Sequence, residues 1–555
     1  MDAKELWLKL RKASVLRTSE YLLERLADHN VGHIFGIPGD YVVPFFADAQ
    51  ESSVRVVTTT HEPSAGYAAD AYARIRGLGV AVATWGVGAL NMLNAAAQAF
   101  AERSPVLFIS GAPEAKARIP DRLLHHEVKD WESQLRVYKE VTCASVNLTD
   151  DAQVCEQIDT VLDEIVRLKR PGYIEIPRDI SKSNVEKRTI VKRAPNRSAE
   201  FHDLLSKVTA QVVQLINQST SPVIYAGVEI ERFNLRSELI RFAKKANLPV
   251  TTSLLGKSAF PETHPNFAGI YMGAVGSQTA RDLVEKSDCV LMLGGFMTDL
   301  DSGLFTMRVR DENLILADAS HVRVRGETYP DTNLPDLIQS LLLSPGFKPR
   351  SLPLRKAEAK ATASTSNELT SQAIIEELNN FVGDDMIAVA DVGDCLFSCV
   401  DLQVNRFVAP AFYASMGFGV PAGIGVTLAD PTRRPVVLVG DGGFQMTGVE
   451  LCTARRLQQN PIVIVFDDGY YGTLRNIGPD LKSFELARWD YAAVAKALGC
   501  DGSSVMTPAE LRSSLRIALE SKLPYVIDAK ITGRPSQFLQ RVTELISKKT
   551  RQDPA

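Results

Sequence analysis

Two short runs of apolar residues in the last third of the chain each end in acidic and glycine residues. The first run, 436–439, leads into Gly440-Asp441-Gly442-Gly443, and the second, 462–466, leads into Asp467-Asp468-Gly469. Such runs predict buried parallel strands that stop at the carboxyl edge of a sheet. The stretch 446–458 between them predicts a helix, so the unit is β-α-β. A chain with this unit folds as an α/β protein, whose ligands bind at that edge.

The residues at this edge suit a divalent cation and a diphosphate. Asp441 and Asp468 offer two hard oxygen ligands of the kind that Mg²⁺ prefers. The glycines of the first motif allow the backbone to approach a phosphate closely. Gly-Asp-Gly and Asp-Asp are each also common in plain turns and loops, so it is their pairing that favours a metal and diphosphate site.

The length and composition indicate several globular domains. A chain of 555 residues is too long to fold around one hydrophobic core, and its length predicts about three or four domains. Its apolar fraction of 45% is enough for each domain to bury a core. Its 62 basic and 66 acidic residues are mixed throughout, which argues against nucleic acid as a partner. The seven cysteines lack zinc-site spacing and predict free thiols. Because no signal peptide or long apolar run is found, we expect the cytoplasm.

Strand and helix patterns alternate in three blocks, which predicts three doubly wound parallel-sheet α/β domains. We expect domains at 1–183, 197–350 and 370–555, separated by linkers at 184–196 and 352–369. Helices are expected at 19–30, 63–76 and 91–102. Besides the two runs above, strands are expected at 33–35, 54–58, 80–84, 106–110, 173–176, 222–227, 249–252, 289–294, 386–390 and 525–528.

The paired motifs resemble the fingerprint of the thiamine diphosphate (ThDP) enzymes, in which Gly-Asp-Gly is followed after a fixed gap by two asparagines. The resemblance implies that Asp441, Asp468 and the carbonyl of Tyr470 hold Mg²⁺ and that ThDP is the cofactor. It also implies that the three domains are pyrimidine-binding, middle and diphosphate-binding. Asp467-Asp468 replaces Asn-Asn and adds negative charge beside a diphosphate. Further cofactor-binding residues implied are Asp391, Gly393, Met416, Gly440, Gly442, Gly443, Tyr471 and Gly472.

A glutamate in the first block matches the catalytic glutamate of this family. Glu62 follows the strand expected at 54–58 and opens a helix, where by itself it is a carboxylate stabilised by the helix dipole. The segment 61–70 resembles the one whose glutamate hydrogen-bonds the aminopyrimidine and activates the cofactor.

A second segment, 413–421, resembles the loop of these enzymes whose bulky apolar residue supports the bent cofactor. Met416 stands at the position of that residue in this chain. The alternative interpretation is that Met416 only fills the hydrophobic core.

A pair of histidines and an aspartate are the candidates for proton transfer. Adjacent residues do not share a helix face, which argues against His125-His126 as a metal pair, and a polar surface loop is the alternative. The pair is typical of the 2-keto acid decarboxylase branch of the ThDP enzymes, as is Asp40 in Gly36-Ile37-Pro38-Gly39-Asp40. The resemblance implies that Asp40, His125 and His126 transfer protons of substrate and intermediates.

Leu474 stands where pyruvate decarboxylases carry a glutamate. The chain is here similar to bacterial phenylpyruvate and indolepyruvate decarboxylases, which place Leu at this point and use an aspartate of the middle domain. Asp299 fits that aspartate, with a plain loop residue as the alternative. An apolar residue in the substrate wall favours a bulky or aromatic 2-keto acid. The candidates for this wall are Thr473, Leu474, Val392 and Phe538.

The resemblance covers nearly the full length and implies a function. It implies an Mg²⁺- and ThDP-dependent enzyme that decarboxylates a 2-keto acid, without oxidation, to an aldehyde and CO₂. It also implies a homodimer or homotetramer with active sites between subunits. A ThDP carboligase, and a non-catalytic homologue, remain open as alternatives.

Overall fold

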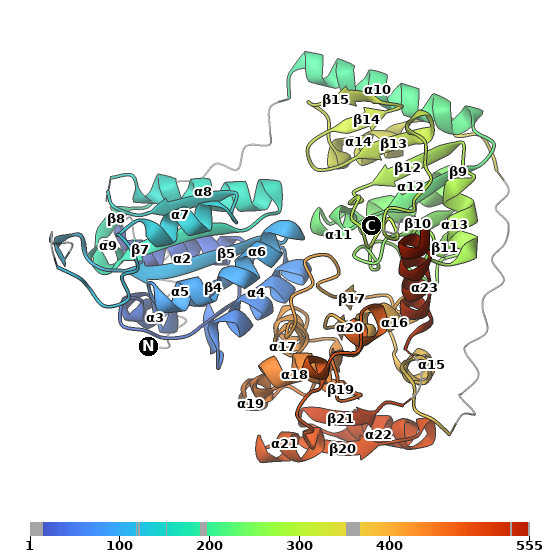
Figure 1. Ribbon diagram of the computed structural model, residues 1–555. Helices are drawn as coiled ribbons and strands as arrows, with labels where there is room; N and C mark the ends of the chain where they lie inside the picture. Colours follow the sequence, from blue (N-terminus) through green and yellow to red (C-terminus); the bar gives the residue numbers. More distant parts are fainter. Residues whose placement is uncertain are drawn as a thin grey trace.

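The computed structural model describes residues 15–117, 119, 122–150, 152–188, 197–350, 367–532 and 535–552. Within these ranges the chain forms three α/β blocks, each around one mainly parallel sheet (Figure 1). The first block is blue to teal in Figure 1, the middle block green to yellow, and the third block orange to red. The predicted three-block α/β architecture is confirmed.

The first block has a parallel six-stranded sheet in the order β3-β2-β4-β5-β7-β6. The predicted strands are confirmed, and β6 is an additional one. Its four residues are only half buried at the sheet edge, so no apolar run marked them. The strands are β2 (His33–Gly36), β3 (Arg55–Thr58), β4 (Gly79–Ala83), β5 (Val106–Ala112), β6 (Ala144–Asn147) and β7 (Gly172–Pro177). The helices are α2 (Thr18–Asp28), α3 (Val43–Gln50), α4 (Glu62–Arg76), α5 (Val87–Asn91), α6 (Leu93–Ala101), α7 (Ser133–Lys139), α8 (Val154–Leu168) and α9 (Arg178–Lys182).

The strand order of this sheet reverses between β2 and β4, which is where open α/β sheets bind ligands. Asp40 follows β2 and Glu62 follows β3, while the two histidines come after β5. All of them therefore lie beyond the carboxyl ends of the strands. Glu62 is the first residue of α4, with Pro63 in the first turn, and the helix ends where Gly77 adopts a φ of 94°.

The third block has a parallel sheet in the order β17-β16-β18-β19-β21-β20. The β-α-β unit is confirmed, because β18 and β19 are neighbours with Gly440 opposite Phe466. The strands are β16 (Met386–Ala390), β17 (Phe407–Val408), β18 (Arg434–Gly440), β19 (Ile462–Asp467), β20 (Asp501–Val505) and β21 (Tyr525–Lys530). The helices are α15 (Ser371–Phe381), α16 (Asp394–Ser398), α17 (Gly419–Ala429), α18 (Asp441–Thr447), α19 (Leu451–Arg456), α20 (Gly472–Ile477), α21 (Tyr491–Ala497), α22 (Pro508–Glu520) and α23 (Gln537–Gln552).

The prediction of one helix at 446–458 is wrong in two respects: the helix begins earlier, and it is interrupted. The helix α18 begins at Asp441, and a 3₁₀ turn at Gly448–Glu450 separates it from α19. Because glycine has a low helix propensity, the glycines of the motif predict a helix start later than the observed one. Asp441 lies at the helix start because its carboxylate accepts the free N–H group of Gly442 (2.8 Å).

The middle block has a sheet in the order β11-β10-β9-β12-β13-β14-β15, of which the part up to β13 is parallel. The strands β14 and β15 form an antiparallel hairpin, which the expectation of a wholly parallel sheet did not include. Arg325 and Gly326 make its turn with φ of 50° and 88°. The strands are β9 (Pro222–Ala226), β10 (Val250–Thr252), β11 (Phe267–Ile270), β12 (Cys289–Leu293), β13 (Leu314–Ala317), β14 (Val322–Val324) and β15 (Glu327–Tyr329). The helices are α10 (Ala199–Gln218), α11 (Glu229–Arg232), α12 (Arg236–Ala246), α13 (Gln278–Glu285) and α14 (Leu334–Leu343).

The expected linkers are only partly described. The stretch from 184 begins with β8 (Asn184–Glu186), which pairs antiparallel with β1 (Val15–Arg17), so its first residues form a two-stranded ribbon. Residues 189–196 and 351–366 lie outside the described ranges. In the described ranges no helix is both long and apolar enough to span a membrane.

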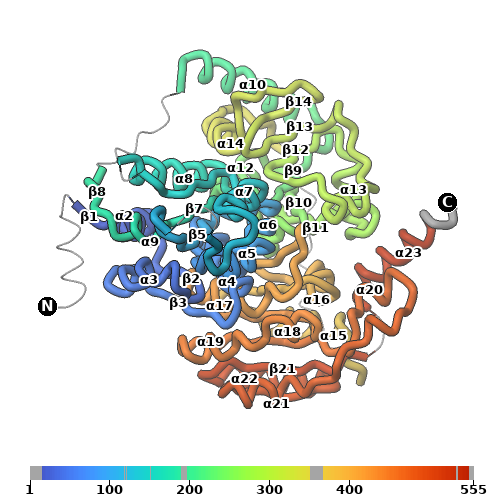
Figure 2. Tube along the Cα trace, turned by 60° about the vertical axis from the view of Figure 1, so that its left-hand side comes forward, coloured from blue at the N-terminus to red at the C-terminus, as the bar shows by residue number. Residues whose placement is uncertain are grey.

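The first and third blocks pack on each other through α4 and α17, which lie side by side in Figure 2. Their contact is close because a Cβ atom on Gly425 would lie 2.2 Å from the carbonyl oxygen of Ala68. Alanines of both helices and valines of α17 share one buried cluster. The helix that starts with Glu62 is therefore fixed to the third block of the same chain.

Candidate active site

A cavity of about 710 Å³ lies at the carboxyl edge of the third sheet. Its volume is within the usual range of small-molecule sites. The residues predicted from the sequence that line it are Val392, Gly393, Met416, Gly440, Asp441, Gly442, Gly443, Asp468, Tyr470, Tyr471, Gly472, Thr473 and Leu474. Most of the expected cofactor and substrate residues of this block therefore share one cavity.

The two predicted metal-binding carboxylates are neighbours at the cavity floor. Asp441 accepts N–H groups of Gly442 (2.8 Å) and Gly469 (2.7 Å), and Asp468 accepts that of Tyr470 (2.9 Å). Burial, reinforced by the charge of Asp468, raises the pKa of Asp441 to about 7, and burial also raises that of Asp468. Neither carboxylate forms an ion pair with a described residue. A divalent cation between them would remove this repulsion, so the donor set fits Mg²⁺.

The glycines beside these carboxylates have no room for a side chain. A Cβ atom on Gly442 would lie 2.7 Å from the Tyr471 ring, and one on Gly472 would lie 2.2 Å from Asp468 Oδ2. The backbone of both motifs therefore faces the cavity directly. This cradle fits a phosphate-bearing ligand next to the carboxylate pair.

Asp391 does not line the cavity, in contrast to its prediction as a cofactor-binding residue. It is fully buried, and its carboxylate accepts the N–H groups of Gly417 (3.1 Å) and Gly419 (2.7 Å). Its burial raises its pKa to about 6. Asp391 thus holds the turn that carries Met416, whose side chain lines the cavity.

A buried carboxylate of the first block holds the other end of the Met416 loop. Glu102 Oε1 accepts the N–H groups of Phe412 and Tyr413, both at 2.8 Å. Its second oxygen pairs with Arg74 of α4 at 2.8 Å, and both side chains are almost inaccessible to solvent. The position of Met416 therefore depends on a residue about 310 positions away in the chain, which no local pattern revealed.

We expect replacement of Glu102 by alanine to destabilise the whole chain. The change leaves the buried Arg74 guanidinium without one of its two carboxylate partners and frees two N–H groups. Breaking a buried pair lowers the free energy of unfolding by about 3 kcal/mol or more. Urea unfolding measures this loss. Glu132→Ala, which removes a largely exposed carboxylate, is the control and changes stability by less than about 1 kcal/mol; equal losses would contradict the prediction.

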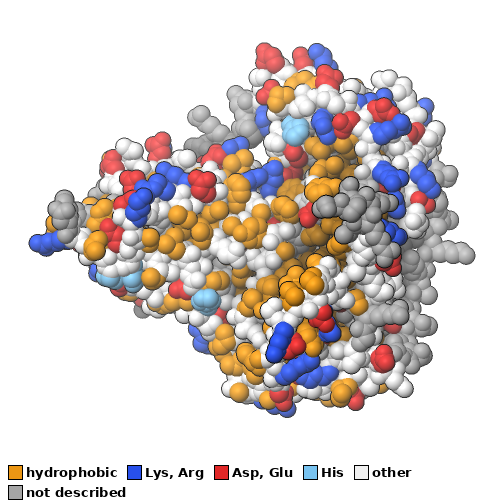
Figure 3. All heavy atoms as spheres, viewed as in Figure 1, with side chains coloured by type: hydrophobic (Ala, Val, Ile, Leu, Met, Phe, Trp, Pro, Cys, Tyr) orange, Lys and Arg blue, Asp and Glu red, His pale blue; other side chains and the backbone are white. Residues whose placement is uncertain are grey.

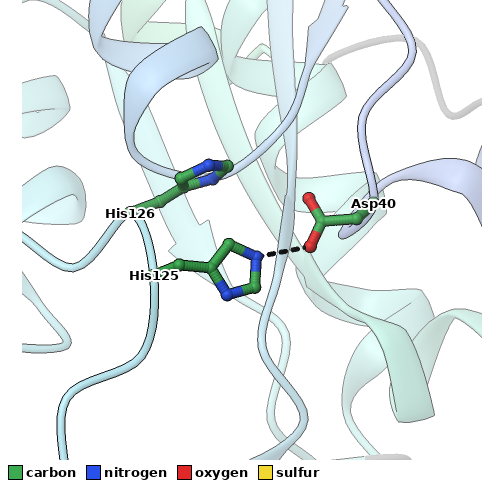
Figure 4. Close-up of side chains that lie close together, drawn as sticks. All are labelled: Asp40, His125 and His126. Atoms are coloured by element: carbon green, nitrogen blue, oxygen red, sulfur yellow. Dashed lines mark hydrogen bonds and ion pairs between the residues drawn. The ribbon is translucent and has the colours of Figure 1, made fainter.

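Asp40, His125 and His126 lie together at the edge of the first sheet (Figure 4), and we name them the acid–histidine cluster. His125 Nε2 lies 2.7 Å from Asp40 Oδ2, and its Nδ1 lies 3.2 Å from the Tyr41 hydroxyl. Although partial burial opposes it, the hydrogen bond from His125 lowers the pKa of Asp40. The histidines lie in a turn, where His126 has a φ of 73°, so the helix argument against their meeting does not apply. Such a group can hold and pass protons.

Two residues that the sequence did not indicate position Glu62. Asn91 Nδ2 donates to Glu62 Oε2 at 2.8 Å. Glu450, buried in the third block, accepts the N–H (2.9 Å) and hydroxyl (2.6 Å) of Thr60, two residues before Glu62. The carboxylate of Glu62 is therefore held from its own block, and the backbone just before it is held from the third block.

Within one chain, the first-block groups do not reach the cavity. Neither Glu62 nor the acid–histidine cluster lines it. Asp299 does not line it either, because it sits exposed on the loop after β12, where it accepts the N–H of Leu300 (2.9 Å). The chain thus presents two separate half-sites: the cavity, and the edge of the first sheet with Glu62 and the acid–histidine cluster.

The predicted wall of the cavity needs one correction. Phe538 is buried behind the wall and stacks on Phe397 with ring centroids 4.9 Å apart. Phe397, on the short helix α16, lines the cavity in its place. Only packing shows which of the two rings reaches the cavity. Further lining residues that the sequence did not indicate are Ser371, Asp394, Cys395, Phe466, Asn476, Asp480, Ile531, Thr532 and Pro535.

Comparisons with known proteins show the family to which the chain belongs. The chain matches three domain families of thiamine pyrophosphate enzymes: the N-terminal TPP binding domain at 16–133, the central domain at 209–341 and the C-terminal TPP binding domain at 391–529. It is 36% identical to the indole-3-pyruvate decarboxylase of Azospirillum brasilense, over 91% of this chain and 94% of the relative. It is 31% identical to the alpha-keto-acid decarboxylase of Mycobacterium leprae, over 96% and 98%.

The fold and the three matched domain families are those of a thiamine pyrophosphate enzyme. Within that class, the chain belongs to the family of thiamine pyrophosphate-dependent alpha-keto-acid decarboxylases. Thiamine pyrophosphate and thiamine diphosphate are two names for one cofactor.

Proposed function

We propose that the protein is an Mg²⁺-dependent decarboxylase of bulky, aromatic 2-keto acids such as phenylpyruvate or indolepyruvate. The observation that carries this proposal is the cavity, which is lined both by the carboxylate pair and by apolar side chains that include Leu474 and Phe397. An aromatic side chain gains more from such a wall than the methyl group of pyruvate. The name of the Azospirillum relative, indole-3-pyruvate decarboxylase, supports the same substrate class.

The residues present supply the remaining roles of such an enzyme. Bound ThDP supplies an electron sink for the carbanion left by loss of CO₂. Asp441, Asp468 and the carbonyl of Tyr470 would hold Mg²⁺ and with it the diphosphate. Glu62 would accept a hydrogen bond from the cofactor and activate it. We assign proton delivery to the product to the acid–histidine cluster.

We further propose that two chains complete each site, in a homodimer or homotetramer. The two half-sites of one chain are separate, and large apolar side chains beside them are exposed: Val87 (60%), Leu123 (89%), Met446 (50%) and Leu474 (46%). Figure 3 shows hydrophobic side chains gathered over the first block and the hollow between it and the other blocks. A second copy of the chain would cover these side chains and bring Asp40 and Glu62 to the cavity. It could also bring Asp299 there.

The reducing cytoplasm is the location we propose. All seven cysteines are free thiols in the structure. Burial raises the pKa of the thiol of Cys399 to about 12, so it is unreactive. Free, inert thiols are typical of proteins in reducing compartments.

The experiment that tests the proposed function measures CO₂ and aldehyde release from a panel of 2-keto acids. The panel contains pyruvate and branched, phenyl-, indole- and polar acids, each with Mg²⁺ and ThDP. We expect kcat/KM to be highest for phenylpyruvate or indolepyruvate, by about tenfold or more over pyruvate. Highest efficiency for pyruvate would contradict the aromatic preference. Acyloin in place of free aldehyde, with an acceptor aldehyde present, would identify a carboligase.

Asp468→Asn should keep or strengthen ThDP binding. Asn preserves the acceptor for the Tyr470 N–H group and an oxygen ligand for Mg²⁺, while it removes one of two adjacent buried charges. We expect the dissociation constant of ThDP, measured by calorimetry at fixed Mg²⁺, to be equal or up to about tenfold lower. Asp468→Leu, which removes the oxygen ligand, is the comparison and should bind weakly. A collapse of binding in Asp468→Asn would show that this site needs both charges.

A further inference from the structure

Asp467 precedes Asp468 in the second motif, but its side chain does not face the cavity. It is only 2% exposed and, unlike Asp468, does not line the cavity. Lys530 is its cross-strand neighbour at the end of β21, and the Lys530 ammonium group forms an ion pair with Asp467 Oδ2. The same ammonium lies 2.9 Å from Asp528. A buried carboxylate directly before the metal ligand Asp468 is therefore compensated from outside the motif.

A second cation reaches Asp467 across the loop that follows it. Arg488 Nη1 lies 3.6 Å from Asp467 Oδ1, and its guanidinium covers Gly469 so closely that a Cβ there would be 2.0 Å away. The N–H group of Leu486 donates to the carbonyl of Gly469 at 2.9 Å. The segment of Arg488 thus holds the loop whose next carbonyl, that of Tyr470, is the third proposed metal ligand.

The charges of this region require such compensation. Asp441, Asp467 and Asp468 place three carboxylates at one sheet edge, where the cofactor would add a diphosphate. A single Mg²⁺ offsets two charges, and a buried charge without a partner is strongly unfavourable. Asp441 and Asp468 have no ion-pair partner among described residues, whereas Asp467 pairs with both Lys530 and Arg488.

We propose that Lys530 and Arg488 are positioning residues for the cofactor: by neutralising Asp467, they prevent it from repelling the diphosphate and hold the metal-binding loop in place. The inference rests on the proposed binding of Mg²⁺ and ThDP. Neither cation lines the cavity, and the carboxylate that both of them pair with is Asp467. If the role is correct, the effect of removing either cation on cofactor binding depends on whether Asp467 is charged. A general contribution to folding would not depend on Asp467 in this way.

The test is a mutant cycle read as the dissociation constant of ThDP at fixed Mg²⁺, by calorimetry. We expect Lys530→Met to raise this constant by about tenfold or more, because Asp467 then remains as an uncompensated charge. Asp467→Asn alone should bind like the wild type. The double variant Asp467→Asn/Lys530→Met should recover to within about threefold of the wild type, because the repelling charge is gone. Lys522→Met, an exposed lysine just before the other end of β21, is the control and should change nothing.

Arg488→Gln keeps the test independent of folding, because the Arg488 side chain is 63% exposed. It should also weaken ThDP binding, and Asp467→Asn should again restore it. Wild-type affinity in both Lys530→Met and Arg488→Gln would overturn the inference, as would a double variant as weak as Lys530→Met alone. A wild-type protein that binds no ThDP would instead overturn the proposed function, so the two failures are distinguishable.

Discussion

Glu62→Ala should reduce decarboxylation by at least about 100-fold while ThDP and Mg²⁺ remain bound. Glu62 lies in the half-site of the first block, away from the cavity that would hold the metal and the diphosphate. Its removal therefore leaves the proposed ligands of the cofactor intact. What is lost is the carboxylate that would activate the cofactor, so exchange of the C2 proton of bound ThDP should also stop. NMR of the exchange and calorimetry of binding measure the two effects separately.

The variant Glu62→Gln tests whether the effect depends on the charge of the Glu62 side chain, because glutamine has nearly the same shape without the charge. The amide oxygen can still accept the hydrogen bond from Asn91, so the geometry of the first turn of α4 is retained. The amide cannot take up a proton, and C2 exchange should be as slow as in Glu62→Ala. Loss of a partly exposed first-turn carboxylate costs the helix at most about 1 kcal/mol, so the melting temperature should fall little. Normal exchange in either variant would remove Glu62 from its assigned role.

Asp441→Ala should abolish ThDP binding, with a dissociation constant raised by about 100-fold or more. The change removes one of the two proposed carboxylate ligands of Mg²⁺. It also removes the acceptor that fixes the N–H groups of Gly442 and Gly469, one in each motif. Calorimetry at increasing Mg²⁺ measures the loss. Because burial and Asp468 raise the pKa of Asp441 to about 7, protons should also weaken Mg²⁺ binding to the wild type below that pH.

Asp480→Ala is the matched control for Asp441. Asp480 also lines the cavity, but its carboxylate is exposed and pairs with Arg475 at 3.4 Å. If general negative charge in the cavity attracted Mg²⁺, both substitutions would weaken binding alike. We expect near wild-type affinity in Asp480→Ala. Equal affinity in the wild type and Asp441→Ala would contradict the metal assignment.

The sequence predicts this fold well where buried strands are continuous apolar runs. β5, β12 and β19 are buried along their whole length, and their runs are bounded by glycine or acidic residues. Edge strands such as β6 and the hairpin of β14 and β15 have half-exposed or short patterns that a loop also shows. Tertiary pairing, not local propensity, decides those elements.

The candidate site is predictable only in part, for a related reason. Residues in one motif, such as Asp441 and Gly442, have fixed spacing and could be found from the sequence. Glu102 and Glu450 act on backbone groups about 300 and 390 positions away, which have no sequence signal. Phe538 and Phe397 are both aromatic, and only their packing shows that Phe397 is the ring that lines the cavity.

The most direct test of the account mixes two inactive variants, Glu62→Ala and Asp441→Ala. If each active site combines the first block of one chain with the third block of another, a mixed dimer contains one site with both halves intact. After the variants are unfolded together and refolded in equal amounts, random pairing should restore about one quarter of wild-type decarboxylation. Refolding of each variant alone should restore none. No activity in the mixture, with mixed dimers present, would contradict a site shared between two chains.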